Sequence, residues 1–357
     1  MLLKSLQLVN FRSHSAYEAQ FTNQVVAFVG NNGIGKTNLL DAIHHLCYAK
    51  GFLNSVDNQN IKTDSDFYFI QGIFSKEEQK FSITCSLKKG IKKVIKNNDK
   101  IYKTIAEHIG KFTAIVISPN DTIAVNEGSD ERRKLLDILI AQMQPEYLNA
   151  LIRYNHILKQ RNTFLKQNPN DLSLLDAYNF QLHQLGSFIY KTRKETMLLI
   201  QPLFQDYYNK ISEQKEIVEM IYESDLSSKP LIELLEETRA KDLIIQNTSK
   251  GIHKDDVLFK VNDLPMKKYA SQGQQKSVII AVKLAQYELL KTINNNKPLF
   301  LLDDIFDKLD KQRVTKLITL ILNQKNNGQI FITHTDKETL AQILTPILEN
   351  FDTIELE

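Results

Sequence analysis

The chain has 357 residues, a net charge of +3, and ordinary shares of hydrophobic and charged residues, 42% and 24%. A chain of this length can bury a substantial core and is expected to form two lobes. It contains no stretch of about 18 apolar residues and no signal-peptide core, which argues against membrane and secreted proteins and predicts a cytoplasmic location. Cys47 and Cys85 form no C-x-x-C motif, so neither a zinc hook nor a disulfide framework is expected.

The first predicted elements are two strands and a helix. Residues 2–11 alternate apolar and polar side chains, which indicates a half-buried strand, and residues 24–29 form an apolar run typical of a buried strand. Farther on, apolar residues recur at helical spacing: Leu39, Leu40, Ile43 and Leu46.

The loop between this second strand and the helix fits the pattern G-x-x-x-x-G-K-[ST] at every position: Gly30, Asn31, Asn32, Gly33, Ile34, Gly35, Lys36 and Thr37. Glycines let successive backbone N–H groups point at phosphate oxygens, and the phosphates lie at the helix N-terminus. Lys36 can reach the β- and γ-phosphates, and the Thr37 hydroxyl can bind Mg²⁺. The strand before and the helix after argue against a chance match. The loop therefore predicts a nucleotide-binding site.

Lysines dominate the next segment, with eight of them between residues 88 and 111 against two acidic residues. Apolar and basic residues alternate around Lys89-Gly90 and Asn97-Asn98, which predicts strands joined by hairpin turns with one charged face. This face is either a solvated edge that prevents aggregation or a DNA-binding surface. Its candidate DNA contacts are Lys89, Lys92 and Lys93.

The middle of the chain, residues 126–245, predicts a mainly helical lobe. Its helices are expected at Arg132–Gln142, Tyr147–Gln167 and Leu172–Glu195, separated by turn signals at 168–170 and 227–230. Strand-like segments return at residues 256–261, 298–303 and 329–333. The predicted fold class is therefore α/β, with one lobe assembled from residues 1–125 and 246–357 and a helical lobe inserted between them.

Two carboxylates follow the apolar run 299–302, where ligands gather in open α/β sheets. We expect Asp303 to hold Mg²⁺ opposite Thr37, and Asp304 to orient or deprotonate the attacking water. A polar strand end is a common alternative for one aspartate, but a weak one for two adjacent acids after four apolar residues.

The segment Ser271–Gln275 directly precedes an apolar helical stripe. A small polar segment at a helix start can bind an anion, although a plain N-cap and turn would look the same. Together with the phosphate loop and the acidic strand, it resembles the signature motif of ABC-type ATPases. The resemblance implies an ATP-dependent homodimer in which the signature of one protomer contacts the ATP of the other through Ser271, Gly273 and Gln274. His334 follows the last predicted strand, and the resemblance implies that it is the switch histidine, which contacts the γ-phosphate. The implied catalytic residues are therefore Lys36, Asp304 and His334.

The inserted helices distinguish among ATPases with these motifs. SMC-type chromosome ATPases insert long coiled coils, whereas the helices predicted here break after about three to six turns. Transporter subunits insert a shorter helical subdomain. The length of the insert fits neither group.

Further motifs resemble the RecF family of bacterial recombination mediator ATPases. Residues 8–14 look like the opening shared with SMC-type heads, which places Arg12 beside the nucleotide. Residues 118–121 and 127–137 are similar to the hallmark stretch of the family, with Asn120 and Asp130 as departures.

The resemblance continues to His334. Residues 158–162 resemble the motif of the helical arm, and residues 251–256 resemble the Gly-Pro-His-Arg-Asp-Asp motif, with Ile252 and Lys254 as departures. Residues 306–310 occupy the place of the D-loop. Within the 251–256 motif we expect His253 to be a structural histidine.

The resemblance implies an ABC-type P-loop ATPase head with a helical arm lobe. It implies an ATP- and Mg²⁺-dependent repair protein that binds duplex DNA near single-strand gaps, helps to load RecA together with RecR and RecO, and has a weak, DNA-stimulated ATPase activity. Basic residues of the arm are additional candidates for DNA contacts, or else form a solvated face: Arg132, Arg133, Lys159 and Arg161. The alternatives are a transport-type ATPase subunit that drives a membrane partner, and a nucleotide-dependent structural adaptor with negligible turnover.

Overall fold

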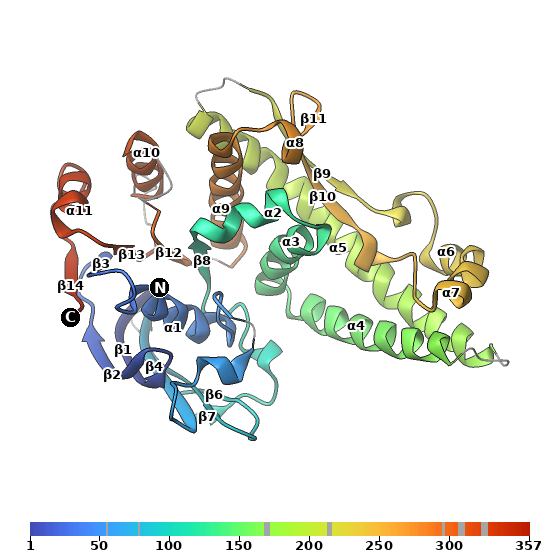
Figure 1. Ribbon diagram of the computed structural model, residues 1–357, viewed down its shortest axis with the longest axis horizontal. Coiled ribbons are helices and arrows are strands. Elements are labelled where there is room, and N and C mark those ends of the chain that lie inside the picture. Colours follow the sequence, from blue (N-terminus) through green and yellow to red (C-terminus); the bar gives the residue numbers. More distant parts are fainter. Residues whose placement is uncertain are drawn as a thin grey trace. The chain divides into compact units, whose positions relative to one another are not determined.

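The computed structural model describes residues 1–54, 56–77, 79–167, 172–212, 216–294, 297–305, 311–322 and 328–357 (Figure 1). Contacts among these residues divide the chain into two compact units. Unit 1 comprises Met1–Asp121 and Ile280–Glu357, and unit 2 comprises Thr122–Ile279. In the described ranges, no helix is long and apolar enough to cross a membrane.

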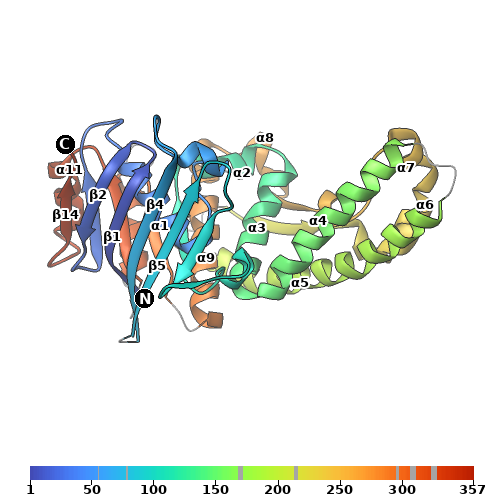
Figure 2. The same cartoon turned by 90° about the horizontal axis from the view of Figure 1, so that it is seen from below.

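Unit 1 contains an antiparallel sheet that Figure 2 shows from its outer side. In spatial order, its strands are β2 (His14–Gln20), β1 (Leu2–Phe11), β4 (Phe67–Lys76), β5 (Gln79–Lys88), β6 (Val94–Asn97) and β7 (Lys100–Ile101). The predicted strand at residues 2–11 and the hairpins around Gly90 and Asn98 are therefore present.

Unit 1 also contains a parallel sheet. In spatial order, its strands are β14 (Asp352–Glu355), β3 (Val25–Val29), β13 (Ile330–His334), β12 (Leu299–Leu302) and β8 (Ala114–Ile117). Except for β14, these strands are buried along their whole length, as expected for apolar runs covered on both faces. Since neighbouring strands run in the same direction, their carboxyl ends meet at one edge of the sheet.

Helix α1 (Lys36–Tyr48) contacts strands of both sheets and completes the core of unit 1. Its predicted apolar residues, such as Leu39 and Ile43, are fully buried. The helix begins directly after the phosphate loop, so its position fixes the loop against the carboxyl end of β3. Two further helices of unit 1 are α10 (Lys311–Leu322) and α11 (Lys337–Leu344).

Unit 2 is mainly helical and contains an antiparallel sheet. Its elements are α2 (Ile123–Asn126), α3 (Ser129–Met143), α4 (Pro145–Lys166), α5 (Ser173–Ser212), β9 (Val218–Glu223), α6 (Leu231–Glu237), α7 (Arg239–Ile245), β10 (Asp256–Val261), β11 (Leu264–Pro265) and α8 (Met266–Tyr269). Helices α4 and α5 lie side by side (Figures 1 and 2). Helix α9 (Gln272–Asn294) begins in unit 2 and continues in unit 1.

The predicted end of the third helix at Glu195 is wrong. Helix α5 has 40 residues and continues through Pro202 to Ser212, which exceeds the expected three to six turns. The extension is stabilised by apolar side chains that keep helical spacing beyond residue 195 and are buried: Met197, Ile200, Phe204, Tyr207, Tyr208 and Ile211.

The boundaries of the units differ from those expected at 125/126 and 245/246. The division falls after Asp121 and after Ile279 instead. The reason is strand pairing, because β10 pairs along its length with β9 and so belongs to unit 2, although the sequence placed it in the other lobe.

Candidate functional site

The phosphate loop joins β3 to α1 and has the backbone that its glycines predict. Gly30, Gly33 and Gly35 all have positive φ. At Gly35, a Cβ atom would lie 2.6 Å from both Nε2 of His14 and Oγ of Ser13. Glycine is required there because the turn between β1 and β2 lies directly against the loop.

The side chain of Lys36 follows the loop backbone. Its Nζ atom donates to the carbonyl oxygens of Gly30 and Asn31, at 2.7 and 2.9 Å, and the residue is 4% exposed. Asn31, Asn32 and Gly33 are exposed, whereas Ile34 and Gly35 are half-buried. The loop therefore presents its tip outward and its ammonium group inward, an arrangement suited to enclosing a phosphate at the start of α1.

Two hydroxyl groups converge on Asp303 at the end of β12. Thr37 Oγ1 donates to Asp303 Oδ1 at 2.8 Å, and Thr333 Oγ1 donates to the same oxygen at 2.9 Å. Burial raises the pKa of Asp303 above its ordinary value, although both hydroxyl groups oppose this shift. A buried carboxylate of this kind gains from a bound cation.

The oxygen atoms around Asp303 fit Mg²⁺. Thr37 and Asp303 supply the hard oxygen ligands that this ion prefers, and phosphates and water usually complete its shell. Within the described ranges, no cluster of three or more His, Cys, Asp or Glu residues could hold a metal by itself.

The two other predicted catalytic residues flank this carboxylate. Asp304 has a φ of 42°, which is uncommon for a residue other than glycine, and its backbone N–H donates to Thr333 Oγ1 at 2.9 Å. His334 is 6% exposed and ends β13, where its carbonyl oxygen accepts from Gly30 N at 3.3 Å. The order β3-β13-β12 thus brings the loop, His334 and the two aspartates to one edge of the sheet.

Arg12 lies in the turn between β1 and β2, and the next two residues, Ser13 and His14, lie against Gly35. Its Nε atom donates to Oδ2 of Asp41 at 2.7 Å. The turn is also tied to α1, because Ser13 Oγ accepts from Asn38 Nδ2 at 2.8 Å. The structure thus brings the turn that carries Arg12 to the loop, and contact of Arg12 with a nucleotide stays a prediction.

Sequence reasoning did not identify Thr333, Asp41 or His14 as parts of the site. Thr333 precedes the predicted histidine, but only the pairing of β12 with β13 places its hydroxyl on Asp303. Asp41 follows Lys36 on α1, and His14 Nε2 lies 3.1 Å from the Gly35 carbonyl oxygen. His14 ends the 8–14 motif but was given no role there, and Thr333 and Asp41 were not singled out, because the contacts join distant segments.

The signature residues belong to unit 2, at the start of α9. Ser271 N donates to Gln274 Oε1 at 2.6 Å, and Gln274 N donates to Ser271 Oγ at 3.2 Å. This reciprocal pair is a capping box, the plain helix cap that the sequence left open as an alternative. Ser271 is exposed and Gly273 is half-buried, and their contact with the ATP of a partner stays a prediction.

The lysine-rich turn between β5 and β6 divides into exposed and buried lysines. Lys89 and Lys92 are exposed, although Lys89 has an acidic neighbour, Asp66, at 3.6 Å. The Lys93 side chain is only 8% exposed, and its Nζ atom lies 2.6 Å from Oδ1 of Asp57. Lys93 therefore anchors the turn, and the structure leaves its predicted contact with DNA without support.

Two arginines at the start of α3 bind within unit 2. Arg132 donates through Nε and Nη2 to both carboxylate oxygens of Asp256, at 2.7 and 2.9 Å. Arg133 donates to the Asp255 carbonyl oxygen and to Asp130. Each side chain is 11% exposed and is held by partners in unit 2, so the structure gives these arginines a structural role and leaves the predicted contact with DNA without support.

The third arginine of the arm is also unavailable to DNA. Arg161 is fully buried and donates to Asn179 Oδ1 at 2.8 Å and to Asp242 Oδ2 at 2.9 Å. The structure therefore leaves the predicted DNA contact of Arg161 without support as well. Lys159 on the same helix is exposed and stays a candidate.

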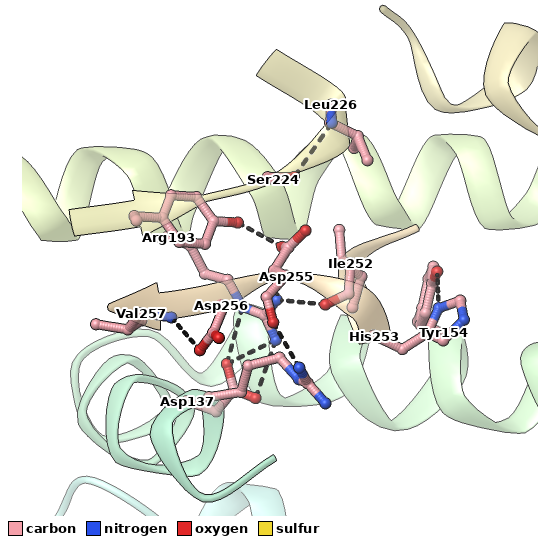
Figure 3. A network of polar contacts seen from close by, with 12 residues as sticks. Asp137, Tyr154, Arg193, Ser224, Leu226, Ile252, His253, Asp255, Asp256 and Val257 are labelled. Atoms are coloured by element: carbon pink, nitrogen blue, oxygen red, sulfur yellow. Dashed lines mark hydrogen bonds and ion pairs between the residues drawn. The ribbon is translucent and has the colours of Figure 1, made fainter. Parts of the chain in front are cut away.

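The 251–256 motif forms part of a polar network in unit 2 (Figure 3). Arg193 from α5 donates to the Ile252 carbonyl oxygen at 2.7 Å, to Asp255 Oδ2 at 2.9 Å and to Asp137 Oδ1 at 3.0 Å. Tyr222 from β9 also donates to Asp255. The motif therefore joins α3, α5 and β9 through paired buried charges.

His253 lies beside this network. Its Nδ1 and Nε2 atoms each lie 3.1 Å from a partner, the Tyr154 hydroxyl and the Thr248 carbonyl oxygen, as Figure 3 shows for Tyr154. Burial lowers its pKa to about 4. The histidine is thus held neutral in a structural position. The predicted D-loop, residues 306–310, and the turn at 168–170 lie outside the described residues.

Comparisons with known proteins cover nearly the whole chain. The family described as RecF/RecN/SMC N terminal domain matches residues 2–350. The DNA replication and repair protein RecF of Flavobacterium johnsoniae is 43% identical over 348 residues, which cover 96% of this chain and 97% of that protein. The protein of the same name from Phocaeicola vulgatus is 39% identical over 360 residues, covering 100% of this chain and 97% of that protein.

Solved structures agree with the family match. A structure of the recombination mediator protein RecF-ATP in the RecFOR pathway superposes with a TM-score of 0.87 at 29% identity, covering 94% of this chain and 92% of that chain. A structure of RecF-ATPrS in the same pathway gives a TM-score of 0.86 at 30% identity over the same shares. An Smc head domain from Pyrococcus furiosus, 14% identical with a TM-score of 0.56, covers 100% of this chain and 94% of that chain, and shows the shared fold alone.

Proposed function

This chain belongs to the RecF family of DNA replication and repair proteins, and we propose that it is an ATPase that closes as a dimer around ATP and holds DNA in that state. The observation that carries the proposal is the convergence of the Thr37 and Thr333 hydroxyl groups on Asp303, beside the phosphate loop. The RecF structures solved with ATP and with ATPrS support the choice of nucleotide.

Each residue of the site has a role that its position supports. Lys36 neutralises charge on the β- and γ-phosphates, and the loop N–H groups bind phosphate oxygens. Thr37 and Asp303 hold Mg²⁺, which supplies a positive charge against the leaving phosphate. Asp304 orients the attacking water, and His334 contacts the γ-phosphate. The backbone of Asp304 is left-handed and its N–H group donates to Thr333. Strained residues of this kind are concentrated at functional sites, which supports the role proposed for Asp304.

The partner protomer would complete the site. Ser271, Gly273 and Gln274 bind the γ-phosphate held by the other copy, through the N-terminus of α9. The exposure of Ser271 at the start of this helix supports a contact in trans. Because neither protomer contains a complete site under this proposal, ATP is the link between two copies.

DNA would bind to the closed dimer mainly through its phosphates. After the correction for buried groups, the candidate contacts are Lys89 and Lys92 on the β5–β6 turn and Lys159 on α4. A dimer doubles each of these patches, so a modest charge per protomer suffices for duplex DNA. We propose that the site of action is a single-strand gap in the cytoplasm, and that the protein acts with RecR and RecO to help load RecA. The RecFOR pathway named for the related structures supports this assignment.

The proposal is tested by size-exclusion chromatography with ATP, ADP or no nucleotide, each with and without gapped duplex DNA. We expect a dimer only with ATP, and co-elution of DNA with that dimer. ATP turnover measured in parallel should rise when DNA is added. A monomer under all conditions would contradict the dimer. Turnover that ignores DNA would favour a transport-type ATPase, and absence of turnover would favour a structural adaptor.

A further inference from the structure

Arg132, at the start of α3, uses every nitrogen of its guanidinium group within unit 2. Nε and Nη2 donate to the two carboxylate oxygens of Asp256, the first residue of β10, at 2.7 and 2.9 Å. Nη1 donates to the carbonyl oxygens of Ala124 and Glu127 at the end of α2, at 3.4 and 2.7 Å. The carbonyl oxygens at a helix end lack helical partners, so such donors stabilise it. The planar guanidinium group therefore joins α2 to β10 through one rigid contact.

Two sequence motifs that the nucleotide site does not use meet at this contact. Arg132 belongs to the stretch at residues 127–137, and Asp256 belongs to the motif at residues 251–256. Arg133 donates to a backbone carbonyl oxygen of the same motif, which adds a second tie beside the ion pair. The side chains of Arg132 and Asp256 are 11% and 21% exposed, so salt and water screen the pair only weakly. A shielded pair with two parallel hydrogen bonds fixes the orientation of its partners.

The short helix α8 packs against both elements that Arg132 joins, because it contacts α2 and β10 within unit 2. Its first residue, Met266, is fully buried. The helix ends two residues before Ser271, the first residue of the signature. The backbone N–H of Ala270 donates to the Met266 carbonyl oxygen at 3.0 Å, and the Ala270 carbonyl oxygen accepts from Gln275 Nε2 at 3.3 Å. The first turn of α9 is thus tied to the end of α8, and the position of the signature follows from that of α8.

We propose that Arg132 and Asp256 are positioning residues for the signature. Their ion pair holds α2 and β10 together, and these two elements hold α8 and Ser271 where the signature can contact the ATP of the partner protomer. This contact needs precise placement, because a displacement of about 1 Å can weaken a positioned interaction by roughly 100-fold. The inference rests on the ATP-dependent dimer proposed above. It assigns the two motifs a role in dimerisation that involves no contact of Arg132 with ATP or DNA.

The test is the dissociation constant of the dimer, measured by analytical ultracentrifugation of the full chain with ATPγS at a temperature where each variant is folded. Arg132→Lys keeps the charge but cannot bind both carboxylate oxygens and the α2 carbonyl oxygens together. We expect the dissociation constant to rise roughly tenfold or more. The affinity of the dilute monomer for ATPγS should stay unchanged, because the phosphate loop belongs to unit 1. An unchanged dimer, or an equal loss of nucleotide affinity, would overturn the inference.

Arg161→Lys is the matched control. Arg161 is also a withdrawn arginine of unit 2 that binds a carboxylate from a distant segment, Asp242, at 2.9 Å. This pair joins α4 to α7, whereas α8 packs against α2 and β10. We expect Arg161→Lys to lose thermal stability and to keep the dissociation constant of the parent dimer. An equal weakening of the dimer by Arg161→Lys and Arg132→Lys would mean that lost stability alone explains the effect, and would overturn the inference.

A double-variant cycle with Ser271 separates positioning of the signature from a general change in unit 2. Ser271→Ala removes the hydroxyl group that is proposed to contact the ATP of the partner, and should itself weaken the dimer. In that background, Arg132→Lys should weaken the dimer much less than it does in the parent, because the contact that it positions is already lost. Equal factors in both backgrounds would overturn the inference.

Asp256→Asn keeps the test decisive if Arg132→Lys does not fold. The asparagine has the same size and can still accept from the backbone N–H of Val257, as Oδ1 of Asp256 does at 2.7 Å, but it turns an amide N–H₂ toward Arg132. We expect it to weaken the dimer by a similar factor, and an unchanged dimer would overturn the inference. If the parent forms no dimer with ATPγS, the proposed function fails. That outcome differs from a parent that dimerises together with variants that dimerise equally well.

Discussion

Thr333 on β13 donates its hydroxyl hydrogen to Asp303, directly after β12, at 2.9 Å, and the same oxygen accepts from the backbone N–H of Asp304. One hydroxyl group therefore binds the carboxylate of Asp303 and the backbone of Asp304, the two predicted acidic residues of the nucleotide site. It also links them to the strand that ends in His334. This contact sets the geometry on which hydrolysis would depend.

Thr333→Val should therefore slow ATP hydrolysis more than it weakens ATP binding. Valine keeps the shape, but Asp303 and Asp304 each lose a hydrogen bond, and we expect single-turnover hydrolysis to fall by roughly 10- to 100-fold. Thr113→Val is the control, because Thr113 is equally buried and its Oγ1 has no partner among the described residues. Equal rates for the two variants would contradict the role of Thr333.

Asp304→Asn should bind ATP and hold the dimer closed. The amide keeps the size of the carboxylate but cannot take a proton from water, so hydrolysis should stop while the Mg²⁺ ligands stay intact. Chromatography after addition of ATP should show a dimer that persists for hours, whereas the parent returns to monomer. Asp303→Asn provides the contrast, because it should lose Mg²⁺-dependent hydrolysis. Hydrolysis by Asp304→Asn at the parental rate would remove this residue from the mechanism.

Ser271→Arg should separate ATP binding from dimerisation. Ser271 lies in unit 2, at the exposed start of α9, so the affinity of the monomer for ATP should stay nearly unchanged. The larger charged side chain should block the γ-phosphate of a partner and abolish the ATP-induced dimer. Gln181→Arg on the exposed side of α5 makes the same kind of change away from the motif. A dimer of Ser271→Arg with ATP would refute contact in trans.

Replacement of Lys89 and Lys92 by glutamine should weaken DNA binding without changing ATP affinity. Each lysine that no longer neutralises a phosphate lowers the log–log salt slope by about one unit, so a decrease of about two units is expected per protomer. Lys93→Gln is the comparison, because Lys93 pairs with Asp57 and should cost roughly 1 kcal/mol of stability while leaving the slope unchanged. The measurement is the affinity for duplex DNA across a series of salt concentrations with ATP present. An unchanged slope for the double variant would assign these lysines to a solvated edge.

His108 should make unit 1 less stable in mild acid. It is fully buried, and burial lowers its pKa to about 4 from an ordinary value of 6.5. Between pH 6.5 and pH 4, the imidazole of His108 is therefore protonated in the unfolded chain but neutral in the folded chain. The free energy of unfolding consequently falls as pH drops through this range. At pH 5 the loss is about 2 kcal/mol.

Urea unfolding at pH 7 and pH 5 measures this effect. His108→Gln can still donate to the Leu46 carbonyl oxygen, which lies 2.7 Å from His108 Nε2, and should lose less stability between the two pH values than the parent. His156→Gln, at an exposed position, should behave like the parent. An equal loss for His108→Gln and the parent would contradict the assignment to His108.

The sequence alone was sufficient for the parts of this protein that depend on neighbouring residues. The phosphate loop, the strand before it and the helix after it are contiguous, and short-range backbone preferences and periodicity determine them. The same holds for Leu299–Leu302 with its two aspartates, and for the capping box at Ser271. Helix α5 shows the limit, since the sequence predicted its end at Glu195, whereas a buried apolar stripe continues the helix through Pro202 to Ser212.

Only the tertiary structure decided which polar residues are available to bind a ligand or DNA. Arg132, Arg161 and Lys93 look like surface charges in the sequence, yet each pairs with a carboxylate from a distant segment and is largely withdrawn from solvent, and the pair of Arg161 with Asp242 is fully buried. Conversely, Thr333 and Asp41 carry no motif and enter the site because strand order and helix position bring them there. The physical reason is that the free energy of a buried charge depends on the group opposite to it, and that group is chosen by the fold and not by the chain neighbours.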